Sequence, residues 1–270
     1  MANIDSWVEN ARQEGYSTLY ASAKVCQDIV LKAIAASDFG GHITIKGGVV
    51  MRSITGNIRR ATRDLDLDFI RYSLDEESIR HFIDRLNCLD GITIRIAAPI
   101  EELSQQEYRG KRVFVVIEDD TGHSLRSKID LGVHKQVQVE QDEYCFDICM
   151  DDEGVSLLIN SKEQIFTEKL RSLLRFGPLS TRYKDVFDLC YLAGRMDMER
   201  LTRCLDVYIL SDPGMRETSM EAIRRRLHLT FRDRTYRQRL EQAASANWLN
   251  AGISEVLEQI ETFLRGIEDP

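Results

Sequence analysis

The order of apolar and polar side chains along the first half of the chain predicts a mixed α+β domain. Alternation at period two, the pattern of a strand with one buried face, occupies residues 64–69, 92–96, 112–118 and 124–133. Residues 42–45 form a further, buried strand. Apolar residues at helical spacing occupy 19–36 and 79–86. We therefore expect a mixed sheet flanked by helices.

Local signals mark where these elements begin and end. Two capping boxes, Ser6-x-x-Glu9 and Ser73-x-x-Glu76, predict helix starts, and Gly40-Gly41 and Asp90-Gly91 predict helix ends. The turn-rich tetrad 119–122 joins two strands into a hairpin. The polar segment 97–110 is expected to be a loop, and short strands are expected at 137–139 and 144–148.

From Val155 onward the spacing of apolar residues becomes helical. A capping box, Ser161-x-x-Gln164, opens one helix, and a second helix runs from Arg182 to about Ala193. The remainder, 195–270, reads as amphipathic helix. The pattern therefore divides the chain into an α/β domain over 1–154 and a helical domain over 155–270.

The composition is that of a folded chain that does not span a membrane. With 270 residues, 43% of them hydrophobic and 30% charged, the chain can bury a substantial core. No apolar run approaches the ~20 residues of a membrane span, and the N-terminal MANIDSWVEN is acidic rather than signal-like, so we expect a cytoplasmic protein. Six cysteines without a C-x-x-C pair indicate reduced thiols in the core rather than a zinc site.

Charge is distributed unevenly along the chain. The net charge of −8 argues against general affinity for nucleic acid. Residues 216–239, however, hold eight arginines against three acidic residues, so that this segment carries +5 and the remainder −13. Docking of a polyanion on this segment and a solvated basic helix face are both open interpretations.

The first chemical signal is the strand 64–69, which reads DLDLDF. Its alternation places Asp64, Asp66 and Asp68 on one face, where the carboxylates repel one another unless a cation is near. A hard divalent ion such as Mg²⁺ takes oxygen ligands from one or two carboxylates together with substrate phosphates. We set aside a calcium loop because Phe69 stands where its turn glycine belongs. An edge strand whose acids face water remains the alternative.

The second chemical signal lies just upstream of these acids. Gly47 and Gly48 follow the buried strand and open a short apolar helix. Glycines at a helix start let backbone N–H groups approach a phosphate, and the helix dipole favours the anion. Such a turn alone is often only a turn, but followed by a carboxylate pair on a strand it indicates a nucleotide–metal site.

These residues resemble a known family. The run IKGGVVM (45–51) and the motif Arg-x-Thr-x-Asp-x-Asp (60–66) are similar to the first motif of the AbiEii/MenT group of nucleotidyltransferase-like toxins, distant relatives of the DNA polymerase β superfamily. The resemblance implies a polymerase-β-like nucleotidyltransferase core with a C-terminal helical domain that completes the active site. It also selects Asp64 and Asp66 as the catalytic pair that binds Mg²⁺ or Mn²⁺.

The resemblance implies further residues around this pair. A third metal-binding carboxylate comes from a neighbouring strand in polymerase-β-like sites, and Asp130 is the candidate here; a cross-strand salt bridge to Lys111 or Arg112 is the alternative. The triphosphate of the NTP is expected to bind Lys46, Gly47, Gly48, Arg60 and Arg63, with bracing of the loop as the alternative for Arg60. Gly-Gly stands where polymerase-β-like enzymes often have Gly-Ser, so the triphosphate geometry is not carried over.

The second half of the chain carries the remaining part of the resemblance. Residues 163–170 are similar to the family's helix with an invariant lysine, here Lys169, and Arg182-x-Lys184-Asp185-x-x-Asp188 is similar to its last motif. The resemblance implies that Lys169 neutralises the leaving pyrophosphate or positions the nucleotide, and that Asp185 orients the attacking hydroxyl while the nucleotide-binding Lys184 keeps it ionised. A solvated helix face with local salt bridges is the alternative.

The function implied by the resemblance is transfer of an NMP from an NTP to an acceptor, the 3′ end of tRNA. Translation would be blocked, and the protein would be the toxin of a bacterial toxin–antitoxin or phage-defence pair with a DNA-binding antitoxin as partner. Two alternatives remain. One is an enzyme that modifies a protein acceptor such as its antitoxin, and the other is a GTP-binding or antitoxin-binding protein without transfer.

Overall fold

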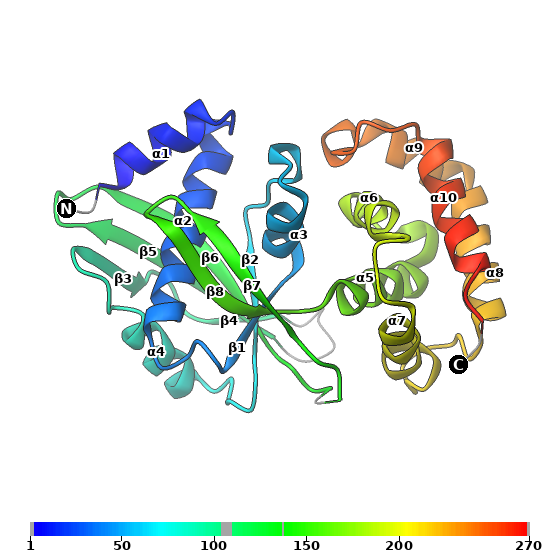
Figure 1. The fold of residues 1–270 in the computed structure, drawn as a ribbon, viewed down its shortest axis with the longest axis horizontal. Coiled ribbons are helices and arrows are strands. Elements are labelled where there is room, and N and C mark those ends of the chain that lie inside the picture. Colours follow the sequence, from blue (N-terminus) through cyan, green and yellow to red (C-terminus); the bar gives the residue numbers. More distant parts are fainter. Residues whose placement is uncertain (1–2, 104–109, 137, 269–270) are drawn as a thin grey trace. The chain divides into compact units, whose positions relative to one another are not determined.

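The computed structural model of the protein describes residues 3–103, 110–136 and 138–268. The chain forms two compact units, Met1–Asn160 and Ser161–Pro270 (Figure 1). Within the described residues the first unit combines a sheet with helices, and the second unit is built from helices alone. The expected α+β class with a C-terminal helical part is confirmed.

The described residues of the first unit form one mixed sheet of eight strands. The strands are β1 (Ile43–Lys46), β2 (Leu65–Phe69), β3 (Ile92–Ile96), β4 (Glu101–Leu103), β5 (Gly110–Asp119), β6 (Ser124–Val133), β7 (Asp142–Ile148) and β8 (Asp151–Ile159). Their order is β3-β5-β6-β2-β1-β8-β7, with β4 paired to β5. The pairs β2–β6 and β1–β8 are parallel, and the other pairs are antiparallel.

Helices cover the apolar face of this sheet. They are α1 (Ile4–Gln13), α2 (Thr18–Ala36), α3 (Gly47–Thr55) and α4 (Glu76–Arg85), with a 3₁₀ turn at Ile58–Arg60. In Figure 1, α2 crosses the sheet, and it contacts β6, β7 and β8. Phe69 of β2 meets Phe82 of α4 with ring centroids 5.1 Å apart. Register aligns the buried Ile45, Leu67 and Leu131 on this same face.

The alternation in β2 therefore has the predicted outcome. Because successive side chains of a strand point to opposite faces, the apolar residues of β2 enter the core and its aspartates lie on the other face. β2 pairs with β1 on one side and β6 on the other, so it is not an edge strand. The alternative of an edge strand with acids facing water is wrong.

The helical unit begins later than predicted. Residues 155–159 belong to β8, where buried Val155, Leu157 and Ile159 alternate with less buried neighbours, and the first helix begins only at Lys162. Three apolar residues at period two fit the strand better than a helix. The chain leaves the sheet at Asn160, whose backbone N–H donates to the Ile45 carbonyl and whose Oδ1 accepts the Thr44 hydroxyl.

Several local predictions also need correction. α1 is capped by Asn3 rather than Ser6, and α4 by Asp75 rather than Ser73, while the cap at Ser161 is confirmed. α4 ends at Arg85, before the expected Asp90-Gly91. The segment expected as a loop contains β4, and residues 104–109 lie outside the described part. Of the strand expected at 137–139, residue 137 lies outside it too, and 138–139 form a turn and a bend.

The second unit contains helices in place of one long amphipathic segment. They are α5 (Lys162–Phe176), α6 (Tyr183–Leu192), α7 (Met198–Leu205), α8 (Met220–Arg232), α9 (Arg234–Gln242) and α10 (Ile253–Arg265), with short helical turns at Gly177–Leu179, Asp206–Leu210 and Ala244–Ala246. α10 packs against α6 and α8. Across the described residues, no helix combines the length and apolar character needed to cross a membrane.

The cysteines are free thiols. Burial raises the pKa of Cys26 and Cys204 to about 12 and that of Cys190 to about 11, so these three remain protonated core thiols at neutral pH. Cys88 and Cys145 are exposed, so the expected core position holds only for part of the set.

Candidate functional site

The polar face of the sheet brings charged residues into one row across four strands. Register pairs Lys46 of β1 with Asp66 of β2, Asp66 with Asp130 of β6, and Asp130 with Arg112 of β5. Directly paired residues of neighbouring strands point to the same face. The structure therefore brings Asp66 and Asp130 next to each other, as the sequence predicted.

Basic side chains accompany the acids on this face. Asp68 accepts a hydrogen bond of 2.5 Å from Lys46 Nζ, and Lys128 Nζ lies 3.0 Å from Asp64 Oδ1. Both oxygens of Asp130 bind the Arg112 guanidinium at 2.7 Å, which is the salt bridge considered as the alternative. The positive side chains offset the repulsion between the carboxylates.

The donor set fits a divalent ion in the kind of its ligands, with one restriction. Carboxylates adjacent on β2 and β6 supply the oxygen ligands that Mg²⁺ takes, and Mg²⁺ completes its shell with water and substrate phosphates. Among the described residues, however, no group of three His, Cys, Asp or Glu side chains is arranged to hold a metal. The residues therefore fit an ion bound jointly with a triphosphate rather than an ion held by protein alone.

The helix start at Gly47 lies directly against this row. Gly47 has φ +68°, and a Cβ placed on it would lie 2.6 Å from Asp66 Oδ2. No side chain caps α3, whose N-cap residue is Lys46. A helix N-terminus favours a nearby anion through its unpaired N–H groups and its dipole. Only glycine meets both the backbone conformation and the approach of the Asp66 carboxylate.

The loop between α3 and β2 holds the other predicted nucleotide residues. A Cβ on Gly48 would lie 2.7 Å from the Thr62 side chain, so the loop packs closely on the start of α3. Arg63 is exposed and makes no ion pair with the described residues, which leaves its guanidinium accessible to an anion. Arg60 is only 3% exposed. Its burial fits bracing of the loop better than contact with a phosphate.

The second group of predicted residues forms a buried ion cluster in the helical unit. Lys169 Nζ of α5 donates to Asp185 Oδ1 at 2.6 Å and lies 2.9 Å from Asp188 Oδ2, both on α6. Trp248 Nε1 also donates to Asp188 at 3.0 Å. Asp185 and Asp188 share one helix face as predicted, but both are buried. The alternative of a solvated helix face is therefore wrong.

Asp185 is held ionised by its neighbours. Burial alone would raise the pKa of Asp185, but the Lys169 ammonium and the Arg182 guanidinium outweigh burial and lower the pKa to about 2. Arg182 Nε lies 2.5 Å from Asp185 Oδ2. These two cations, rather than the predicted Lys184, dominate the shift. The crevice lined by Lys169, Ser180 and Arg182 is too small to hold a water molecule.

We expect acid to destabilise the helical unit through Asp185. Its folded pKa lies below the ordinary value of 3.8, so its contribution is fully present above about pH 4 and is lost as the pH falls toward 2. Asp185→Asn should lower the free energy of unfolding at pH 7 by about 3 kcal/mol, because Lys169 loses one of its buried partners. Equilibrium unfolding of both proteins between pH 2 and 7 measures the loss of stability in acid and the effect of the substitution at pH 7. If the variant kept the pH dependence of the wild-type protein, Asp185 would not be the group responsible.

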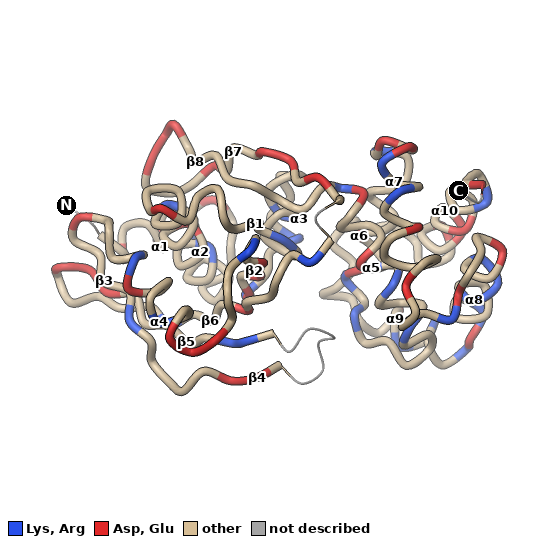
Figure 2. Tube along the Cα trace, turned by 90° about the horizontal axis from the view of Figure 1, so that it is seen from below, with Lys and Arg blue, Asp and Glu red and all other residues tan. Residues whose placement is uncertain are grey.

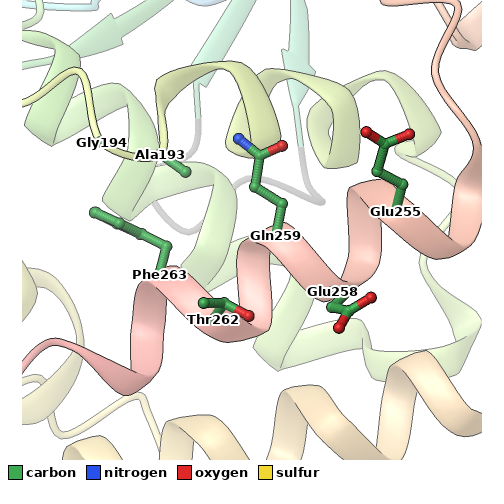
Figure 3. A pocket seen from close by; sticks show the side chains of 7 residues that line it. All are labelled: Ala193, Gly194, Glu255, Glu258, Gln259, Thr262 and Phe263. Carbon is green, nitrogen blue, oxygen red and sulfur yellow. The ribbon is translucent and has the colours of Figure 1, made fainter.

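Two cavities of the helical unit lie away from these residues. One, of about 440 Å³, lies between the end of α6 and α10 and is lined by Ala193, Gly194, Glu255, Glu258, Gln259, Thr262 and Phe263 (Figure 3). The other, of about 410 Å³, lies between α8 and α10. None of the predicted site residues is among the residues that line them, so neither cavity supports the predicted site.

Three buried polar residues near the acids were missed by sequence reasoning. They are Gln27 and Asp28 of α2 and Arg52 of α3, all less than 10% exposed. The signal was present, because Gln27-Asp28 interrupts an otherwise apolar stretch of α2. A polar pair at core positions of a helix indicates buried hydrogen-bond partners.

Similarity to known proteins covers both groups of predicted residues. A family model described as "Nucleotidyl transferase AbiEii toxin, Type IV TA system" matches residues 29–258. The comparison with curated proteins gives no match. Among solved structures, an antigenic nucleotidyltransferase-like protein from Paracoccidioides brasiliensis is similar, with 12% identity, a TM-score of 0.46, and coverage of 92% of this chain and 94% of that chain. Because the family model spans most of the chain, this protein belongs to the AbiEii family of nucleotidyltransferase toxins.

Proposed function

We propose that the protein transfers an NMP from an NTP to the 3′ end of tRNA and so blocks translation, as the toxin of a toxin–antitoxin pair with a role in phage defence. Family membership implies nucleotidyl transfer, an NTP substrate and an antitoxin partner. We further propose that tRNA is the acceptor, that a divalent metal ion is required, and that the residues have the roles described below. We place the reaction in the cytoplasm, where NTPs and tRNA are available.

The observation that carries the proposal is the pairing of Asp66 with Asp130 beside the start of α3. We assign Asp64 and Asp66, with Asp130, as the ligands of Mg²⁺ or Mn²⁺. A divalent ion bound there would neutralise charge on the triphosphate and favour attack of a hydroxyl on the α-phosphorus. This role requires Arg112, which binds both oxygens of Asp130 in the structure, to release that carboxylate.

Positive and backbone groups of the same unit would bind the triphosphate. Backbone N–H groups at Gly47 and Gly48 and the exposed Arg63 supply donors for phosphate oxygens, and Lys46 adds a charge if it exchanges Asp68 for a phosphate. In the helical unit, Lys169, Lys184 and Asp185 remain predictions based on the family motif. Because Lys169 and Asp185 are buried ion partners, their replacement tests stability as well as transfer.

The arginines of α8 and α9 support an RNA acceptor. Figure 2 shows Lys and Arg along these helices. Arg224, Arg226 and Arg237 bind carbonyl or hydroxyl oxygens of the helical unit. In contrast, Arg225, Arg232, Arg234 and Arg239 are exposed and make no ion pair with the described residues. Guanidinium groups that lack carboxylate partners suit phosphodiester oxygens.

We therefore expect the combined change Arg232→Ala, Arg234→Ala and Arg239→Ala to raise the KM for tRNA about tenfold. It should also flatten the dependence of log affinity on log salt by roughly 0.7–0.9 for each phosphate that the protein no longer neutralises. Titration of tRNA at several salt concentrations measures both. Arg203→Ala is the control, since this exposed arginine pairs with Glu199 on α7. An equal loss in the control would contradict a specific role for α8 and α9.

The direct test incubates the protein with Mg²⁺, each α-³²P-labelled NTP in turn, and total bacterial tRNA. We expect label on tRNA with a preferred nucleotide and strongly reduced label with Asp66→Asn. Label on protein instead would favour the alternative of a protein acceptor such as the antitoxin. Nucleotide binding without transfer to any acceptor would favour the GTP-binding alternative.

A further inference from the structure

A buried polar network links α2, α3 and the loop that precedes the acid strand. Gln27 and Asp28 are 0% exposed and Arg52 is 6% exposed. Arg52 Nη1 donates to Gln27 Oε1 at 2.8 Å, and Arg52 Nη2 lies 3.5 Å from Asp28 Oδ1. Asp28 Oδ2 accepts from Lys24 Nζ at 2.6 Å and from the Cys149 backbone N–H at 3.0 Å. The network therefore places two cations, Arg52 and Lys24, around the single buried carboxylate of Asp28.

The amide of Gln27 reaches the loop itself. Its Nε2 donates to the Thr62 carbonyl at 3.1 Å and to the Asp64 carbonyl at 3.4 Å. These carbonyls precede β2, where the backbone has not yet entered the sheet ladder. A backbone carbonyl that lies outside the ladder needs another partner. Gln27 supplies that partner for the two residues on either side of Arg63.

Arg52 determines which way the Gln27 amide points. Its guanidinium is a donor only, so the Gln27 oxygen must face Arg52 and the NH₂ group must face the loop. Arg52 belongs to α3, the helix that begins at Gly47. The network therefore connects the helix start to the loop that leads into Asp64 and Asp66.

We propose that Gln27 is a positioning residue for nucleotidyl transfer, oriented by Arg52, and that it fixes the carboxylate strand relative to the start of α3. The inference rests on the proposed function of this site. Gln27 contacts no substrate in this role. It acts through the backbone, because displacement of a reacting group by about 1 Å can reduce a rate 100-fold.

The variant Gln27→Glu separates positioning from folding. A carboxylate at this position still accepts from Arg52 but donates no hydrogen to the two carbonyls. The matched control is Gln141→Glu, the same isosteric change in the same unit, where the amide donates to the Val139 carbonyl and lies 2.9 Å from His134 Nε2. Should Gln27→Glu fail to fold, Arg52→Lys serves instead. A lysine retains the positive charge beside Asp28, but it lacks the planar guanidinium that contacts Gln27 and Asp28 at the same time.

For Gln27→Glu we expect kcat to fall roughly 10- to 100-fold. The Mg²⁺ concentration for half-maximal rate should rise severalfold, and amide hydrogen exchange should accelerate in residues 61–66, with other segments and the control unchanged. A lower melting temperature with unchanged kcat per folded molecule and unchanged Mg²⁺ dependence would overturn the positioning role. If the wild-type protein transfers no nucleotide, the proposed function fails instead. In that case, unchanged amide exchange at 61–66 in Gln27→Glu would still show that Gln27 does not hold the loop before β2.

Discussion

Replacing Asp66 with asparagine is expected to reduce nucleotide transfer about 10²- to 10³-fold without loss of the fold. Asp66 is the acid that register places beside Asp130 and that lies against the start of α3. Asparagine keeps the shape but removes the charge that a divalent ion and a developing transition state require. Stability should change little, because the change removes one of several neighbouring negative charges.

Single-turnover transfer of labelled nucleotide and thermal unfolding measure the two parts of this prediction. Asp152→Asn is the control, an equal change of charge at an exposed position of β8. We expect the control to retain full activity. Full activity in Asp66→Asn would show that the metal pair has been wrongly assigned.

The second large effect is expected from Gly47→Ala. A non-glycine residue at φ +68° costs about 1–2 kcal/mol, and the new Cβ would approach Asp66 Oδ2 to 2.6 Å. Either the carboxylate or the helix start must move. We expect transfer to fall by about 100-fold, because both groups belong to the proposed site.

Gly56→Ala is a matched control for this change. Gly56 ends the same helix at φ +60°, and no atom lies within 4 Å of its added Cβ. Both variants should therefore lose similar free energy of unfolding, while only Gly47→Ala loses transfer. Transfer kinetics and chemical denaturation of both variants test this comparison. An equal loss of transfer in both variants would show that backbone strain alone lowers the activity of Gly47→Ala.

The acid strand and its surroundings could be predicted because their signal is local. Alternation in β2 determines which residues enter the core, and the glycine pair determines where α3 begins. The helix caps were harder to predict, because Asn3 and Asp75 lie within three residues of the serines that formed the predicted capping boxes. Two cap residues of similar strength in one segment compete, and packing decides between them.

Predictions that depend on distant partners were less successful. The shared face of Asp185 and Asp188 follows from helical spacing, but their burial and their pairing with Lys169 depend on how α5 and α6 pack. Arg112 was only one alternative partner for Asp130, since its pairing needs the register of β5 and β6. Gln27 was missed for the same reason, because the carbonyls that it binds are 35 and 37 residues away.

The end of β8 has a practical consequence for work with fragments of this protein. β8 pairs with β1 through Leu158 and Ile159, and Asn160 adds two hydrogen bonds to β1. A recombinant fragment cut at residue 154 would lose these bonds and expose β1, the neighbour of the acid strand, as an unpaired edge that invites aggregation. A fragment that extends to residue 160 keeps the sheet intact. A fragment of the first unit should therefore end after Asn160, and a reporter protein should be fused only beyond that residue.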